Sequence, residues 1–151
     1  MRHLMTLLFA FTVHSLSAQQ MIDVDGYQGV IFADTVNLDF KIESLAKRFT
    51  PTEQDAFSAD KLILKNKENF VEILGRSFRR DMKKSCRQFF GYYDLNGEKH
   101  VIIILLKMTN RNSKKYFKDW SRKPIFGFGE FYEKNLKILN VNLTKGEVKL
   151  F

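Results

Sequence analysis

The sequence has few of the residues that crosslink a chain or act as nucleophiles. It contains one cysteine, Cys86, and three histidines, two of which, His3 and His14, lie in the first 18 residues. One cysteine excludes an internal disulfide, so packing alone must hold the fold together. Hydrophobic residues make up 44% of the chain and include 15 phenylalanines. That is enough for a sizeable core, because a chain of this size buries roughly two thirds of its unfolded surface.

The sequence also lacks a hydrophobic run near its start that is long enough to span a membrane. The uncharged segment 4–13 is about half of the roughly 20 residues that a spanning helix needs. Arg2 precedes this segment, and the small residues Ser15, Ser17 and Ala18 follow it. That order is typical of an export signal. We therefore expect residues 1–18 to be a signal peptide cleaved near Ala18, leaving an exported periplasmic or extracellular protein without a transmembrane segment. The alternatives are a buried N-terminal helix and an uncleaved anchor.

Motifs for common catalytic mechanisms are missing. Without the signal peptide, His100 and Cys86 are the only histidine and cysteine, and no GxSxG segment occurs. One histidine and one cysteine are too few for the clusters that zinc prefers. We therefore expect no catalytic residues, no metal site and no cofactor. A hydrolase that uses only carboxylates stays an alternative, because any two of the 17 acidic residues could meet in space.

The first half of the remaining chain predicts an arm followed by helix. Residues 19–48 read as an N-terminal arm with a possible short strand within 27–40, where β-branched and aromatic residues gather. Thr50 and Glu53, with Pro51 between them, fit a capping box, so helix should begin near residue 51. The polar segment 65–69 interrupts the apolar stripe that follows. We expect two helices broken near Asn66, although one long bent helix to about residue 84 is the alternative.

A hairpin is the clearest local signal in the chain. Asn96 and Gly97 suit a two-residue turn, because both central positions of that turn need a positive φ. This turn predicts that Tyr93 lies opposite His100 and that Cys86 lies opposite Lys107. Cys86 and His100 would then be seven positions apart, roughly 23 Å at about 3.3 Å per residue, which excludes a Cys–His dyad. Residues 101–106 are apolar on both sides of the strand and predict a central strand with both faces covered.

The last third of the chain predicts further strands. We interpret 110–123 as a polar loop that contains Tyr116 and Trp120, and we expect strands at 125–132, 136–143 and 148–151. Residues 49–151 would form a single α+β domain. In it, an N-terminal helix or broken helix pair would pack on a four- to five-stranded antiparallel meander.

Four segments together resemble a known group of proteins: FTPTEQD, RQFFGYYDLNGEKHVII, the lone tryptophan in KDW, and NVNLTKGEV. They look like small exported bacterial proteins of unassigned function, over about residues 49–151. The resemblance implies export and a cystatin-like fold, and it implies no activity. Inhibition in the manner of true cystatins is not expected, because Phe32 stands where the QxVxG motif needs glycine and no Pro-Trp pair occurs.

Charge gives the remaining clue to function. The net charge is +8, and cations concentrate in 76–87 and 111–123. Such stretches are either solvated surface or contact sites for an anionic partner, and we do not expect nucleic acid as the partner of an exported protein. We therefore predict a binding or interaction module for a protein or an anionic envelope component, with Tyr116 and Trp120 as contact residues. Packing of Trp120 over the sheet edge is the competing interpretation for that residue, and it is the one that the sequence favours. A carboxylate hydrolase and an oligomer-forming structural protein of the envelope are the alternative functions.

Overall fold

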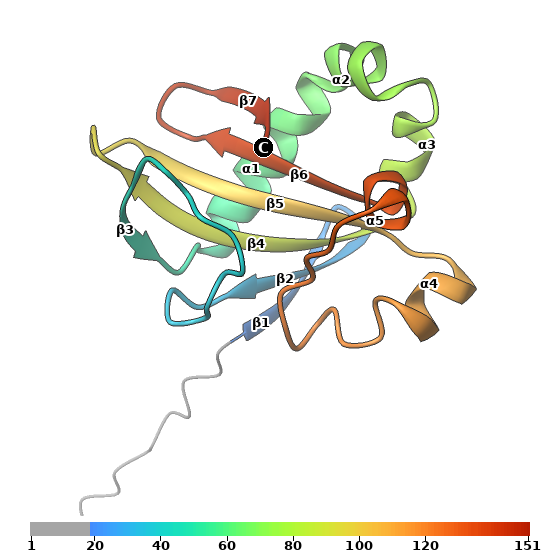
Figure 1. Cartoon of the computed structure of the whole chain (residues 1–151). Helices are drawn as coiled ribbons and strands as arrows, with labels where there is room; N and C mark the ends of the chain where they lie inside the picture. Colours follow the sequence, from blue (N-terminus) through green and yellow to red (C-terminus); the bar gives the residue numbers. More distant parts are fainter. Residues whose placement is uncertain (1–18) are drawn as a thin grey trace, which may run out of the picture.

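One mixed sheet organises the molecule (Figure 1). The computed structural model describes residues 19–151, so the expected signal peptide lies outside the described residues. Within them, seven strands form a sheet in the order β1-β2-β4-β5-β6-β7, and β3 pairs with β4 beside that path. The strands are β1 Gln19–Val24, β2 Tyr27–Phe32, β3 Leu45–Phe49, β4 Ser85–Asp94, β5 Lys99–Lys107, β6 Leu136–Asn142 and β7 Glu147–Leu150.

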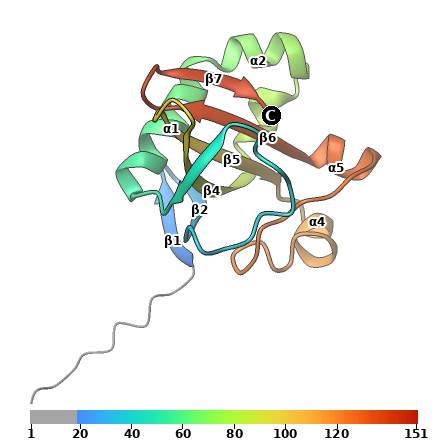
Figure 2. The same ribbon diagram turned by 60° about the vertical axis from the view of Figure 1, so that its left-hand side comes forward.

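Both faces of the sheet are covered (Figure 2). On one face lie three helices, α1 Glu53–Lys65, α2 Lys67–Leu74 and α3 Phe78–Met82, which pack on residues such as Phe89, Ile103 and Leu139. On the other face lie the loop 33–44 and the segment 108–135, which contains the short helices α4 Asn110–Lys115 and α5 Glu130–Asn135. As expected, β5 is central, and its residues 100–106 are all buried.

The predicted fold class is wrong. The structure is a mixed α/β fold with a seven-stranded sheet and interspersed short helices, and not an N-terminal helix on a four- to five-stranded cystatin-like meander. The segment 19–48, expected to be an arm with a possible short strand within 27–40, contributes β1, β2 and the start of β3. The reason is a parallel pairing of β2 with β4, with Val30 beside Gln88. Such a crossover joins segments that lie far apart in sequence, and local patterns do not reveal it.

The two later segments also differ from the prediction. Residues 110–115 are helical, because Thr109 caps them by accepting a hydrogen bond from the Asn112 amide. Residues 125–132 form no strand; the chain turns at Gly129, which has a φ of 95°, and enters α5. The expected strands at 136–143 and 148–151 are present as β6 and β7.

The first helix begins two residues later than predicted. Thr52, and not Thr50, is the N-cap: its Oγ1 accepts from the Asp55 amide, and the Asp55 carboxylate accepts from the Thr52 amide. The hydroxyl of Thr50 instead accepts from the Asp34 amide in the preceding loop. The expected break at Asn66 is present, because α1 ends there and α2 begins after it.

This capping box gives a stability prediction. Thr52→Ala removes the side-chain acceptor of the helix N-terminus and is expected to lower the free energy of unfolding by about 1 kcal/mol. Thr50→Ala, the matched control, should cost less, because Thr50 caps no helix. Urea unfolding followed by circular dichroism measures both. A larger loss for the Thr50 variant than for the Thr52 variant would contradict the assignment of the cap.

Candidate functional site

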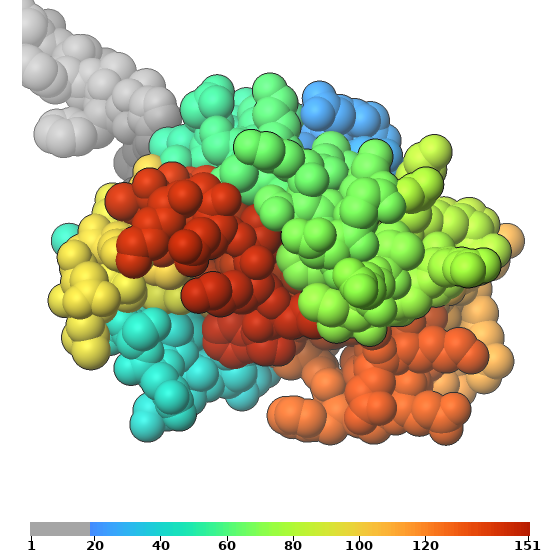
Figure 3. Space-filling view, turned by 90° about the horizontal axis from the view of Figure 1, so that it is seen from above, coloured from blue at the N-terminus to red at the C-terminus, as the bar shows by residue number. Residues whose placement is uncertain are grey.

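A small cavity lies at one end of the central strands. It has a volume of about 170 Å³ and is lined by α3 with its flanks, the first residue of β4, the end of β5, and residues of α5 and β6. Its floor is apolar and includes Phe78, Met82 and Leu105, whereas its rim is charged. Figure 3 shows this part of the surface, with the green α2–α3 segment beside the orange segment that contains α5. Distant parts of the chain therefore form the cavity together.

The charged rim of this cavity is mostly positive. Lys107, Lys134 and Lys137 line it, and Asp81 is its one acidic residue. The Lys107 ammonium lies 2.9 Å from the Asp81 carboxylate. Burial lowers the pKa of Lys137, although Asp81 and Glu133 oppose that effect. The Lys137 ammonium donates to the Glu133 carbonyl, and a bound anion would add a second favourable interaction at this partly buried charge.

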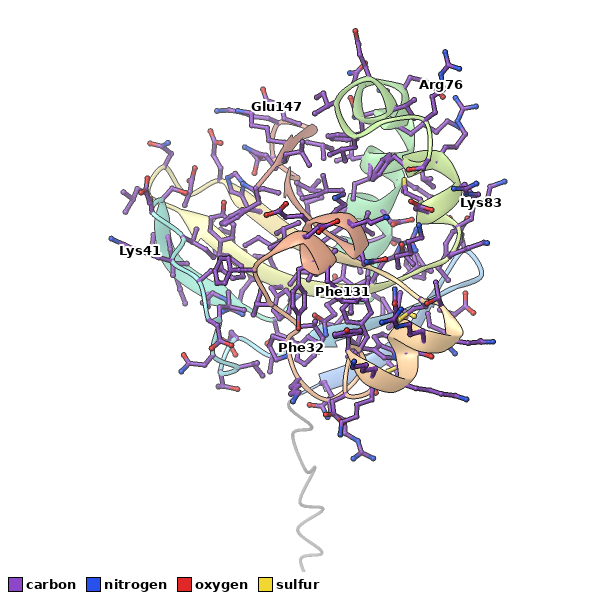
Figure 4. The ribbon with its side chains drawn as sticks, turned by 45° about the vertical axis from the view of Figure 1, so that its right-hand side comes forward. Phe32, Lys41, Arg76, Lys83, Phe131 and Glu147 are labelled. Atoms are coloured by element: carbon purple, nitrogen blue, oxygen red, sulfur yellow. The ribbon has the colours of Figure 1, made fainter. Side chains whose placement is uncertain are left out.

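More cations lie on α3, α4 and their flanks at this end of the molecule, and many have no acidic partner among the described residues. Figure 4 shows Arg76 and Lys83 projecting from the same side of the molecule. Glu68 pairs with Arg79, and Asp81 lies 3.8 Å from Arg80. A further group makes no ion pair with any residue in the range 19–151: Arg76, Lys83, Lys84, Arg111, Lys114 and Lys134. We call the cavity together with these six residues the basic end.

A second, more open depression adjoins the cavity. It has a volume of about 470 Å³ and shares Lys134 and Asn135 with the lining of the first. Tyr116 lines it, half-buried, with its ring stacked on Phe131 at a centroid distance of 3.8 Å. One of the two predicted contact residues thus lies at the basic end, on a surface that a ligand can reach.

The other predicted contact residue, Trp120, is buried. Only 9% of it is exposed, and it packs with Phe117 and Ile125 against the second face of the sheet. This packing is the competing interpretation that the sequence favoured. Tyr116 and Trp120 therefore do not form a joint contact surface, and whether Tyr116 contacts a partner stays a prediction.

The lone thiol and the histidine are far apart. Cys86 pairs with Leu106, while His100 pairs with Tyr92. Six positions separate them along the strand, roughly 20 Å. The register that we predicted, with Tyr93 opposite His100, is wrong by one residue, but the exclusion of a Cys–His dyad is confirmed. Burial raises the pKa of the Cys86 thiol to about 11, so its reactive thiolate is scarce at neutral pH.

Comparisons with protein-family models, curated proteins and solved structures give no match for this chain. The resemblance of residues 49–151 to small exported bacterial proteins thus stays a prediction. Among the helices of residues 19–151, none combines the length and apolar character that crossing a membrane requires.

Proposed function

We propose that the protein is an exported binding module whose basic end binds an anionic, phosphate-bearing component of the cell envelope. The observation that carries this proposal is the convergence of cations on one cavity from separate elements. α3, β5, α5 and β6 all contribute to a rim with three lysines and one aspartate. Lysines that only keep a protein soluble do not need to surround a cavity with an apolar floor.

Electrostatics supports an anionic ligand in particular. Each Lys or Arg near an anionic surface contributes about 1 kcal/mol of binding free energy, and this contribution falls as salt rises. The six unpaired cations of the basic end lose no acidic partner when they bind such a surface. The open depression beside the cavity adds an aromatic ring, Tyr116, next to Lys134. The other functions considered, a carboxylate hydrolase and a structural oligomer, gain no comparable support from the geometry.

The test is co-sedimentation with vesicles that contain phosphatidylglycerol, compared with vesicles of phosphatidylcholine alone. The chain is expected to bind only the anionic vesicles, and binding should weaken as salt is raised from about 50 to about 200 mM. A triple variant, Lys83→Glu, Lys114→Glu and Lys134→Glu, changes one cation on or beside each of α3, α4 and α5. It should weaken binding by about 100-fold, because three favourable contacts become repulsive.

A matched control separates the basic end from net charge. Lys41, Lys47 and Lys61 are exposed, make no ion pair within residues 19–151, and line no part of the cavity. Their reversal to glutamate changes the net charge of the protein by the same amount. The control should retain most of the binding. Equal losses in the two triple variants, or no binding by the native chain, would refute the proposal.

A further inference from the structure

A cluster of acidic and imidazole side chains lies at the opposite end of β4 and β5. The cavity of the basic end adjoins Ser85 and Lys107, whereas this cluster surrounds the β4–β5 turn, nine positions and roughly 30 Å away. Asp94 ends β4, Glu98 lies in the turn, and His100 is on β5. One potential ligand atom from each of the three side chains lies within 4.8 Å of the other two.

The two carboxylates are held in place by other groups. Asp94 Oδ1 accepts hydrogen bonds from the amides of Asn96 and Glu98, at 2.9 and 2.8 Å. Its Oδ2 therefore turns toward the imidazole, 3.4 Å from Nε2. The Lys145 ammonium lies 2.6 Å from Oε1 of the Glu98 carboxylate. The side-chain Nδ2 of Asn142 donates to Oε2 of the same carboxylate, also at 2.6 Å. Each carboxylate thus keeps a fixed oxygen that faces the ring.

The imidazole is oriented by its other nitrogen. The Asn140 side chain donates from Nδ2 to the Tyr92 hydroxyl, at 2.9 Å, so its Oδ1 is the atom that faces the ring as an acceptor. His100 Nδ1, 3.3 Å from that Oδ1, therefore carries the hydrogen. The ring also stacks on Tyr92, at a centroid distance of 4.7 Å. In a neutral ring with this tautomer, the lone pair of Nε2 points at the carboxylates.

This arrangement leaves a buried nitrogen without a partner. His100 is only 8% exposed, and Nε2 makes no hydrogen bond among the described residues. Its nearest charged atoms are Asp94 Oδ2 at 3.4 Å and Glu98 Oε2 at 4.0 Å. A lone pair that faces two carboxylate oxygens is unfavourable, and a cation placed between the three atoms turns each repulsion into attraction.

We propose that Asp94, Glu98 and His100 bind one divalent transition-metal ion, for which Zn²⁺ is the best match. One imidazole nitrogen and two carboxylate oxygens form a ligand set that suits Zn²⁺, whereas Mg²⁺ and Ca²⁺ prefer oxygen alone. Asn140 and Asn142 supply the outer hydrogen bonds that orient metal ligands. Lys145 offsets part of the negative charge, so we expect a micromolar affinity rather than a tighter one. Counting histidines and cysteines alone missed this site because two of its ligands are carboxylates.

The test is calorimetric titration of the whole chain, purified without a histidine tag, with zinc chloride. The native chain should bind one equivalent, and His100→Gln and Asp94→Asn should each weaken binding by about 10- to 100-fold. Glu72→Gln, at an exposed acid on α2, is the control and should bind as the native chain does. The triple variant of the basic end should also retain the zinc affinity, so the two proposals fail independently.

A measurement on the native chain covers the case in which a variant does not fold. Long-range ¹H–¹⁵N spectra of the imidazoles should show His100 with its hydrogen on Nδ1, and addition of zinc should shift the Nε2 resonance most. Unchanged His100 resonances, or zinc affinity that His100→Gln leaves intact, would overturn the proposal. The latter result would assign the ion to other groups such as His3 or His14. A His100 ring that keeps both hydrogens in the presence of zinc would also overturn it, because the ring would then be a cationic partner of Asp94.

Discussion

Replacement of Arg87 by methionine is expected to lower the free energy of unfolding by about 3–5 kcal/mol, the largest effect that we predict for a single charged residue. Arg87 is fully buried on β4, with its Nε 2.6 Å from Oδ1 of Asp60 on α1. It also donates to the Ser85 carbonyl and lies over the Tyr27 ring, 4.1 Å from the centroid. The substitution leaves Asp60, which is 1% exposed, without its counter-ion.

The pH dependence of this variant provides a second check. Burial raises the pKa of Asp60, and Arg87 offsets part of that increase. Without Arg87 the pKa of Asp60 should rise further, so the folded state should bind a proton that the unfolded chain releases. Since stability then falls as pH rises through the pKa of the folded state, the loss should be smaller at about pH 5 than at about pH 7. Urea unfolding at the two pH values measures this difference.

A double variant tests whether the loss comes from the unpaired charge. Arg87→Met combined with Asp60→Leu removes both charges and leaves apolar side chains of similar size. Because hydrophobic replacements of buried ion pairs are often neutral or stabilising, the double variant should recover most of the lost stability. A double variant that is less stable than Arg87→Met alone, or a loss below about 1 kcal/mol in the single variant, would contradict this account.

Local signals in the sequence predicted several elements of the fold. The unbroken apolar run from Val101 to Leu106 indicated a central strand, and the strand expected at 136–143 is present as β6. Leu139 and Val141 lie on the face that α1, α2 and α3 cover, and Ile138 lies on the other face. These features depend on neighbouring residues, and a single sequence displays them directly. The parallel pairing of β2 with β4 depends on residues almost 60 positions apart, and no local pattern encodes it.

The error in the hairpin register had a larger consequence than its size suggests. Only Gly97 has a positive φ, of 77°, so the turn is not the two-residue type that needs two such residues. The Asp94 side chain accepts hydrogen bonds from the backbone amides of Asn96 and Glu98, and this local bonding favours a three-residue loop.

Since side chains alternate across a strand, a shift of one residue in the pairing moves His100 to the other face of the sheet relative to Asp94. The predicted register therefore placed His100 and Asp94 on opposite faces of the sheet. For that reason the cluster of Asp94, Glu98 and His100 was not predicted. An aspartate two residues before Asn-Gly was the signal that could have found it.

The basic end was predictable only in part. The cations of 76–87 and 111–123 are visible in the sequence, and so is their interruption by aromatic residues. Their arrangement around one cavity depends on α5 and β6, which place Lys134 and Lys137 beside α3. The sequence predicted a strand where α5 begins, so this contribution was missed. Tyr116 and Trp120 could not be distinguished, because exposure depends on what packs over each ring.

Gln88 anchors the segment that supports the basic end, and its loss should have the second large effect. The side chain is fully buried on β4. Its Nε2 donates to the carbonyls of Trp120 and Lys123, at 2.5 and 2.8 Å, and its Oε1 accepts from the Ile125 amide at 2.9 Å. The side-chain amide of Gln88 thus bonds three backbone groups of the segment 108–135. These groups lie in no strand, so they have no backbone hydrogen bonds from a neighbouring strand.

Gln88→Leu keeps the approximate volume of the side chain but removes all three hydrogen bonds. Each buried backbone group left without a partner costs about 1–3 kcal/mol, so we expect a loss of roughly 3–5 kcal/mol in the free energy of unfolding. Gln28→Leu, at an exposed position on β2, is the matched control and should change stability by less than about 0.5 kcal/mol. Urea unfolding gives both values.

The fluorescence of the lone tryptophan reports whether Gln88→Leu loosens only the segment 108–135. Trp120 is the only tryptophan and is buried between this segment, to which it belongs, and the sheet, so its fluorescence should shift to longer wavelength if the segment lifts from the sheet. Hydrogen exchange should accelerate at the Ile125 amide, while amides of the central strand β5 stay protected. Because Lys134 and Tyr116 belong to the same segment, binding to anionic vesicles should weaken in the Gln88 variant even though no cation has been changed. Unaltered exchange at Ile125 would show that Gln88 does not anchor the segment, and the link from the core of the sheet to the basic end would be lost.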